Sequence, residues 1–295
     1  MTRRVGWIVG ILVLSAGLGT TAQADRTGAE RVLRARERAD ARPGDPEARL
    51  GLVVELVESG QPGEALAELD LLDALAPTDP RAPYWRARAL VATGRPDAAE
   101  DALRDALDGP SLTLRGELRE ERGARALALE DYLAASAVAP AIELDVRAAH
   151  LLERLSRLDE AARILDAGAR RTGSAVLRVE AAELARRMGR YDVALAHLDA
   201  LAAARPSVRW ELLRASILRD AGREAEAVAT LARARAGADR AVERRGSALA
   251  YSERAQVRLA SGDRAGARLD LERAARLAPA WVVPRQLLSS LGAGR

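Results

Sequence analysis

The most regular feature along the chain is a short pattern of small and apolar residues that recurs seven times. In each copy a small residue precedes an Ala by five positions, and an apolar residue follows that Ala after four more. The seven pairs are Gly60/Ala65, Gly94/Ala99, Gly123/Ala128, Ser156/Ala161, Gly189/Ala194, Gly222/Ala227 and Gly262/Ala267. Their spacings of 34, 29, 33, 33, 33 and 40 residues are typical of a repeat architecture.

The residue types predict two helices in every copy. Gly at the small position accommodates the positive φ that closes a first helix, and Ala shares one face of a second helix with the apolar residue after it. Pro stands twelve residues after the Ala in four copies, where it stops the second helix; these are Pro77, Pro140, Pro206 and Pro279. Ala and Leu dominate the remainder and strand-like alternation is absent, so we expect an all-α fold.

The stretch from Gly189 through Ala194 and Leu198 to Pro206 resembles the tetratricopeptide repeat (TPR) family most closely. The resemblance implies a right-handed superhelical solenoid of about seven helix-turn-helix repeats. The repeats are predicted at 46–79, 80–108, 109–141, 142–174, 175–207, 208–241 and 248–281. We expect a leading helix over 26–41 and a capping helix over 281–291 that covers the last apolar edge.

The chain departs from the family pattern in three respects. The family's early Trp is replaced at its seven expected positions, namely Arg49, Pro83, Leu112, Asp145, Arg178, Glu211 and Tyr251. The third repeat is about five residues shorter than the family's repeat, and residues 109–111 are expected to form a link that bends the stack. The connection around 241–247 is about six residues longer than usual and is expected to extend a helix.

The first 24 residues predict an export signal. Arg3 and Arg4 precede an almost wholly apolar run from Val5 to Leu18, and Ala22 and Ala24 supply small residues before a cut. We therefore expect cleavage after Ala24, a single solenoid over 25–295, and a periplasmic or secreted protein. An uncleaved N-terminal anchor is the alternative.

Composition narrows the chemistry. The chain has no Cys and only two His, and all 46 of its basic residues are Arg. It therefore lacks thiolate metal sites, a phosphate-loop lysine, a Schiff base and most His-based metal centres. No nucleophile–base pattern, Gly-rich nucleotide loop or calcium loop is present, so we expect no enzyme activity, no cofactor and no bound metal.

Charge is distributed unevenly along the chain. Residues 25–80 carry a net −6, residues 81–204 a net −1 and residues 205–295 a net +8. The pI of about 9.9 arises in a chain with net charge of only +3, so it is weak evidence for nucleic acid, which we do not expect as a partner.

The resemblance places the binding surface on the concave wall formed by the first helices, where repeat proteins hold peptides or partner helices. The residues predicted to contact a partner are Tyr84, Arg88, Glu117, His150, Arg154, Glu183, Arg187 and Arg219. Mixed Arg and Glu can form bidentate pairs with a partner, or pair with one another as a solvated surface. A Lys/Asn clamp for an acidic C-terminus is impossible here because both residue types are absent.

His150 invites a sharper hypothesis. It is expected near Glu117 and Glu183, which would make a group able to bind a metal or to titrate near neutral pH, although a plain surface histidine is favoured. His197 is expected to be exposed on a second helix, without a role.

Two functions remain open. The first is an exported scaffold that binds a protein partner in the concave groove during envelope assembly or secretion. The alternative is a peripheral protein that docks on an anionic membrane or cell-wall surface through its Arg-rich C-terminal third. Salt separates them, because contacts held by distributed Arg are screened whereas apolar anchors are not.

Overall fold

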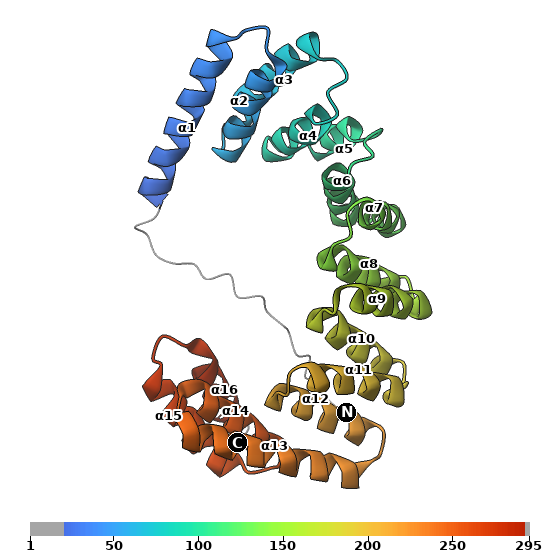
Figure 1. The fold of residues 1–295 in the computed structure, drawn as a ribbon, viewed down its shortest axis with the longest axis vertical. Helices are drawn as coiled ribbons and strands as arrows, with labels where there is room; N and C mark the ends of the chain where they lie inside the picture. The colour runs from blue at the N-terminus through green and yellow to red at the C-terminus, as the bar shows by residue number, and fades with distance from the viewer. Residues whose placement is uncertain (1–20, 293–295) are drawn as a thin grey trace. The chain divides into compact units, whose positions relative to one another are not determined.

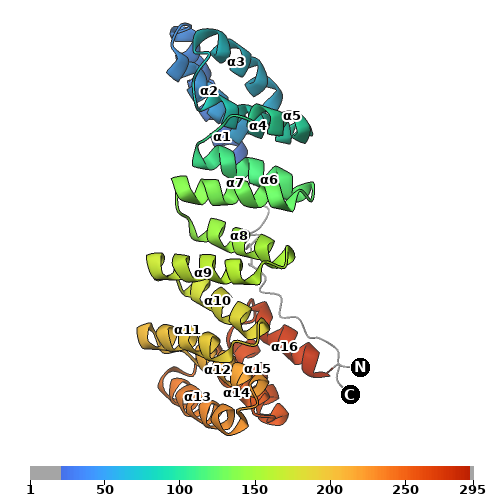
Figure 2. The same cartoon turned by 90° about the vertical axis from the view of Figure 1, so that its right-hand side faces the viewer.

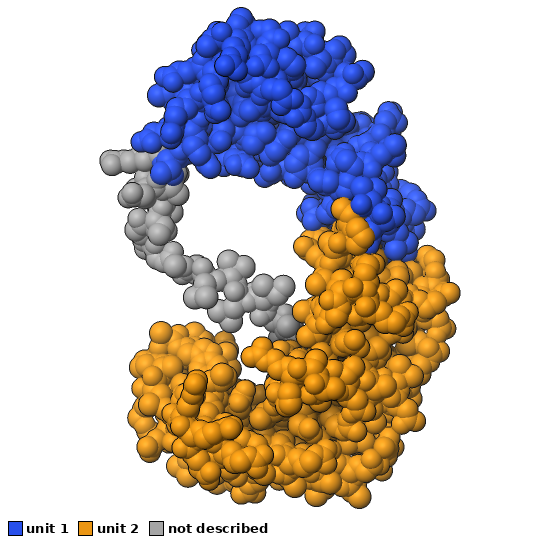
Figure 3. Space-filling model, in the orientation of Figure 1, with its two compact units in different colours: residues 1–138 blue, residues 139–295 orange. Residues whose placement is uncertain are grey.

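The computed structural model describes residues 21–292 and consists, over that range, of sixteen α-helices without a strand (Figure 1). None of the helices in this range is both long and apolar enough to cross a bilayer. The apolar run of 5–18 lies outside the described residues, and the expected cut after Ala24 falls in the first turn of the first helix. The chain divides into two compact units, residues 1–138 and 139–295 (Figure 3).

Unit 1 holds a leading helix and three helix pairs. Its helices are α1 (Thr21–Ala41), α2 (Pro46–Glu58), α3 (Pro62–Leu75), α4 (Ala82–Ala92), α5 (Pro96–Ala102), α6 (Gly109–Glu121) and α7 (Arg125–Val138). The first helices α2, α4 and α6 contact one another in succession, and each packs against its own second helix. Residues 109–111, expected as a link, instead form the first turn of α6, because Asp108 caps the helix by accepting from the amide of Ser111 at 2.9 Å.

Unit 2 holds four helix pairs and a final helix (Figure 2). Its helices are α8 (Ile142–Arg154), α9 (Leu158–Thr172), α10 (Ala175–Arg187), α11 (Tyr191–Ala204), α12 (Val208–Asp220), α13 (Glu224–Arg245), α14 (Ala248–Ala260), α15 (Arg264–Leu277) and α16 (Val282–Gly292). The predicted helix extension around 241–247 is confirmed, since α13 runs for 22 residues. The capping helix is also confirmed, because Leu287, Leu288 and Leu291 of α16 pack against Ala255 and Leu271.

The turn between the two helices of each pair has one backbone conformation in all seven repeats. Its central residue has a φ between 62° and 84°; these residues are Gly60, Gly94, Gly123, Ser156, Gly189, Gly222 and Gly262. The amide of the next residue bonds back to a carbonyl five positions earlier, as from Arg190 to Ala185 at 2.8 Å. This left-handed conformation explains why the repeat begins with Gly, and Ser156 is its one exception.

The repeated apolar positions form the core of both units. All seven pattern alanines are fully buried, namely Ala65, Ala99, Ala128, Ala161, Ala194, Ala227 and Ala267. The residue four positions after each is also buried, including Tyr132, which fills its place with the largest of the fully buried side chains. These small contact residues bring paired helices close together, and the larger ones fill the space between successive pairs.

The same kind of buried ionic bridge occurs within two helix pairs, one in each unit, and the apolar pattern does not predict it. Asp131 on α7 accepts from Arg115 at 2.7 Å and from Arg119 at 2.9 Å, both on α6. Asp270 on α15 holds the two matching arginines of α14 in the same way, with the same sequence offsets. Because each carboxylate is almost completely buried, its two arginines neutralise a charge that would otherwise be costly to bury.

Candidate functional site

An aromatic and cationic cluster lies on α4 in unit 1. The rings of Tyr84 and Trp85 meet edge to face with centroids 5.2 Å apart. The Arg88 guanidinium lies 5.9 Å from the Tyr84 ring centroid and 5.1 Å from that of Trp85. Trp85 packs against buried core residues of α2 and α3, so one ring of the cluster is anchored in the core of unit 1. We call Tyr84, Trp85 and Arg88 the α4 cluster.

The two arginines of α4 differ in how their charge is matched. Arg86 donates to Asp70 at 2.9 Å and to Asp73 at 2.8 Å, both on α3. Arg88 has no carboxylate partner within the part of the chain that the structure describes, and its guanidinium is held only over aromatic rings. Cation–π contacts of this kind contribute roughly 0.5–1 kcal/mol at exposed sites and leave the guanidinium donors available. The neighbouring first helix α6 carries Glu117, which is half-buried.

On the first helices of unit 2, charged side chains bridge one repeat to the next. Arg187 on α10 donates to Glu153 on α8 at 2.5 Å, and Arg186 pairs with Asp220 on α12. Arg219 on α12 donates to the carbonyl of Ala260 at 3.1 Å. This side of unit 2 is therefore a surface of cross-repeat pairs, and a partner carboxylate must compete with Glu153 to reach Arg187.

His150 lies on the same side of α8 and bonds a carboxylate that the sequence pattern did not single out. Its Nε2 lies 3.4 Å from Oε2 of Glu180 on α10. The hydrogen bond from the imidazole raises the pKa of His150 and lowers the pKa of Glu180. Glu183, one of its expected neighbours, pairs instead with Arg186 at 3.6 Å. Glu180 precedes Glu183 by almost one helical turn, so only the registration of neighbouring helices distinguishes the two.

The eight predicted contact residues are divided between the units. Tyr84 and Arg88 meet in the α4 cluster of unit 1. Glu117 also belongs to unit 1, on α6. Unit 2 holds the other five, namely His150, Arg154, Glu183, Arg187 and Arg219. Trp85 and Glu180 join these sets through contacts that no motif in the sequence identifies. No group of three His, Cys, Asp or Glu able to hold a metal occurs among the described residues.

His197 was expected to be exposed, and that expectation is wrong. Its side chain is 15% exposed, and its Nε2 lies 3.0 Å from Asp166 on α9. Burial lowers the pKa of His197, because the charged imidazolium loses its hydration. Arg178 and Arg170 lower it further by repulsion, and Asp166 opposes the shift. His197 on α11 is therefore half-buried beside a carboxylate of the preceding second helix, α9.

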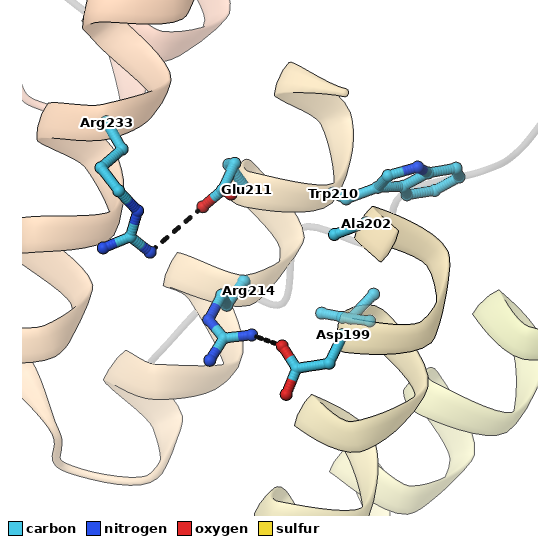
Figure 4. A pocket seen from close by; sticks show the side chains of 7 residues that line it. Asp199, Ala202, Trp210, Glu211, Arg214 and Arg233 are labelled. Carbon is cyan, nitrogen blue, oxygen red and sulfur yellow. Dashed lines mark hydrogen bonds and ion pairs between the residues drawn. The ribbon is translucent and has the colours of Figure 1, made fainter. Parts of the chain in front are cut away.

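A half-open hollow of about 260 Å³ lies between α11, α12 and α13 in unit 2. Figure 4 shows the indole of Trp210 on one side and two ion pairs across the hollow, Asp199 with Arg214 and Glu211 with Arg233. The remaining lining residues are Leu198 and Ala202. All four charged residues that line the hollow are paired with one another. A ligand in the hollow would therefore meet the Trp210 indole but no charged side chain without an ion-pair partner.

Comparisons with known proteins agree on the architecture. A search of curated proteins finds no match. Residues 56–108 match the family model described as tetratricopeptide repeat.

Two solved structures are similar to this chain, and the first of them shows the same kind of fold. The C-terminal part of a TPR repeat-containing protein from Cytophaga hutchinsonii superposes with a TM-score of 0.50 at 14% identity, over 79% of this chain and 97% of that chain. A tetratricopeptide repeat protein from Parabacteroides merdae gives a TM-score of 0.45 at 21% identity, over 83% of this chain and 98% of that one. Residues 56–108 are therefore similar to the tetratricopeptide repeat family, and the seven helix pairs of the described residues have the fold of a tetratricopeptide repeat solenoid.

Proposed function

We propose that the protein is a non-catalytic interaction scaffold that binds a peptide or helix of a protein partner on its first helices. Proteins of this fold are generally scaffolds, and solenoids bind partners through surfaces built from successive repeats. The α4 cluster is the anchor of the proposed site in unit 1. The charged first helices of unit 2 provide a second, more selective surface.

One observation carries the proposal. Arg88 lies over Tyr84 and Trp85 without a carboxylate partner in the described part of the chain, while Arg86 two residues earlier is paired twice. Trp, Tyr and Arg are the residues most enriched among binding hot spots, since they combine large contact area with few rotatable bonds or with several donors. A carboxylate of the partner would pair with the Arg88 guanidinium, and an apolar side chain beside it would pack against the rings of Tyr84 and Trp85.

We also propose that this scaffold acts outside the cytoplasm, in envelope assembly or secretion. The support is the order of Arg3 and Arg4, an apolar run and Ala22-Gln23-Ala24 at the N-terminus. N-terminal sequencing of the protein from the periplasm or medium tests the location. A mature chain that begins at Asp25 is expected, and an uncleaved Met1 in the membrane fraction contradicts cleavage.

The partner test is in-cell crosslinking with mass spectrometry, followed by affinity measurement on the partner captured. Arg88→Glu is compared with Arg125→Glu, because Arg125 also lies in unit 1 and also has no carboxylate partner among the described residues. We expect Arg88→Glu to weaken binding about 30-fold or more, the effect of losing a hot spot of about 2 kcal/mol. Arg125→Glu is expected to leave affinity within about twofold.

Arg187→Glu tests the surface of unit 2 separately. It removes the cross-repeat pair with Glu153 and places two carboxylates together, so a partner that contacts this surface is expected to bind more weakly. The proposal fails if crosslinks to the captured protein map away from α2, α4 and α6 and neither Arg88→Glu nor Arg187→Glu changes the affinity.

A further inference from the structure

A second surface, unrelated to the α4 cluster, lies at one end of the last helices of unit 2. The C-terminus of α13 leads into α14 at Gly246, and α15 returns antiparallel to α14 before joining α16 (Figure 1). Tyr251 near the start of α14 contacts the Arg273 guanidinium near the end of α15, 5.7 Å from the ring centroid. Residues 240–249 and 273–282 therefore meet at this end, which we call the arginine–leucine tip.

The tip has a large excess of positive charge. Its sequence holds five arginines and one carboxylate, Glu243. The arginines are Arg240, Arg244, Arg245, Arg273 and Arg276. All five are exposed, and none has a carboxylate partner among the described residues. The adjoining carboxylates are already engaged, Asp239 by Arg254 and Glu272 by Arg268.

The same end also exposes apolar side chains. Leu249 is 59% exposed, Leu277 is 53% exposed and Val282 is 46% exposed. Trp281 precedes Val282 and is half-buried. Helix C-termini explain part of the charge, because Arg in a last turn stabilises the helix dipole. They do not explain exposed Leu and Val at the same end, where burial would be favourable.

We propose that the arginine–leucine tip docks on the surface of an anionic phospholipid bilayer. Arginines match the charge of the headgroups, exposed leucines enter the boundary with the acyl chains, and Trp is favoured at that depth. A polymer that carries only acidic groups would match the arginines and would leave Leu249, Leu277 and Val282 without a partner. This docking goes beyond partner binding by the first helices and does not depend on it.

The test is co-sedimentation of the full chain with phosphatidylcholine vesicles that contain or lack about a third phosphatidylglycerol. Arg245→Glu/Arg276→Glu reverses the charge at two positions of the tip. Arg163→Glu/Arg264→Glu is the matched control, because it makes the same change at exposed arginines outside the tip. The full chain is used in every case, so any contribution of the apolar residues 5–18 is constant.

We expect binding that depends on phosphatidylglycerol and falls at least about 25-fold in the tip variant, since the loss of each arginine near an anionic surface costs roughly fivefold and each new Glu is repelled. The control variant is expected to bind within about threefold of the unmodified chain, through long-range charge alone. Circular dichroism establishes that both variants are folded. Equal losses in the two variants, or binding that ignores phosphatidylglycerol, overturn the proposal.

A second measurement separates lipid from an acidic polymer. Brominated lipids quench tryptophan near the acyl boundary, so with Trp7 replaced by Phe throughout, the chain is expected to lose fluorescence on binding, and Trp7→Phe/Trp281→Phe is expected to keep its own. Leu277→Ser/Val282→Ser is expected to weaken vesicle binding while leaving attraction to soluble polyglutamate unchanged. Binding to polyglutamate without binding to vesicles, or quenching that persists in Trp7→Phe/Trp281→Phe, contradicts lipid docking by the tip.

Discussion

Ser156 offers the sharpest test of how the repeat turns are built. It has a φ of 62°, in a position that Gly occupies in the other six repeats. Its backbone makes the same contacts as those glycines, since its amide bonds to Glu153 at 2.9 Å and the next amide bonds to Leu152 at 2.8 Å. Its side chain is exposed, and no hydrogen bond from its hydroxyl occurs in the described part of the chain. Replacing Ser156 with Gly therefore removes strain and no contact.

The magnitude follows from two opposed effects. A residue with a Cβ costs roughly 1–2 kcal/mol in the left-handed region. Gly in turn costs about 0.4–1 kcal/mol through the greater freedom of the unfolded chain. We expect Ser156→Gly to stabilise the protein by about 0.5–1 kcal/mol, and Gly189→Ser, at the equivalent turn with φ of 71°, to destabilise it by a similar amount.

Urea unfolding followed by circular dichroism measures both changes as shifts in midpoint. Hydrogen exchange of the amide of Arg157 reports the same turn locally, and its protection is expected to rise in Ser156→Gly. Repeat proteins can unfold in segments, so the exchange of this amide reports the stability of the turn even where unfolding begins in another repeat. A destabilised Gly189→Ser with an unchanged Ser156→Gly would show that Ser156 does not hold this conformation in solution and would refute the reasoning.

Three further predictions concern buried and half-buried charge. The hydrogen bond to Glu180 raises the pKa of His150 in the folded protein, so the protonated imidazole stabilises the fold. This stabilisation is complete below the unfolded pKa of about 6.5 and is lost as pH rises through the folded pKa. His150→Gln is therefore expected to be more destabilising at about pH 5.5 than at about pH 8.5 in urea titrations. His197 has a lowered pKa in the folded protein, so as pH falls below about 6.5 the unfolded chain takes up a proton at His197 before the folded chain does, and stability is lost. His197→Gln is therefore expected to reduce this acid-induced loss of stability. If the two variants respond to pH in parallel, the opposite pKa shifts of His150 and His197 are contradicted. Asp131→Ala leaves two arginines facing a buried gap and is expected to cost about 3–5 kcal/mol in thermal or urea unfolding, whereas a loss below about 1 kcal/mol would mean that water satisfies them.

The local elements of this chain follow from short-range physics. The turn glycines, the buried alanines five residues later and the prolines after the second helices each act within one helix pair, so their spacing alone predicts where helices end. The structure confirms this at Gly189, where the turn closes α10, and at Pro206, before which α11 ends at Ala204. The excess of Arg toward the C-terminus and the lack of Cys and Lys are likewise properties of the sequence alone.

Contacts between repeats depend on the registration of one helix against the next. A shift of three residues moves a side chain by almost one turn, about 4.5 Å along the axis, which is enough to exchange Glu183 for Glu180 as the partner of His150. The burial of His197, the stacking of Arg88 on two rings and the meeting of 240–249 with 273–282 are of the same kind. The sequence by itself determined a helical repeat with its turns and charge gradient. Only tertiary packing decided which charges are matched across repeats and which have no carboxylate partner among the described residues, because that depends on distances of a few ångströms between separate helices.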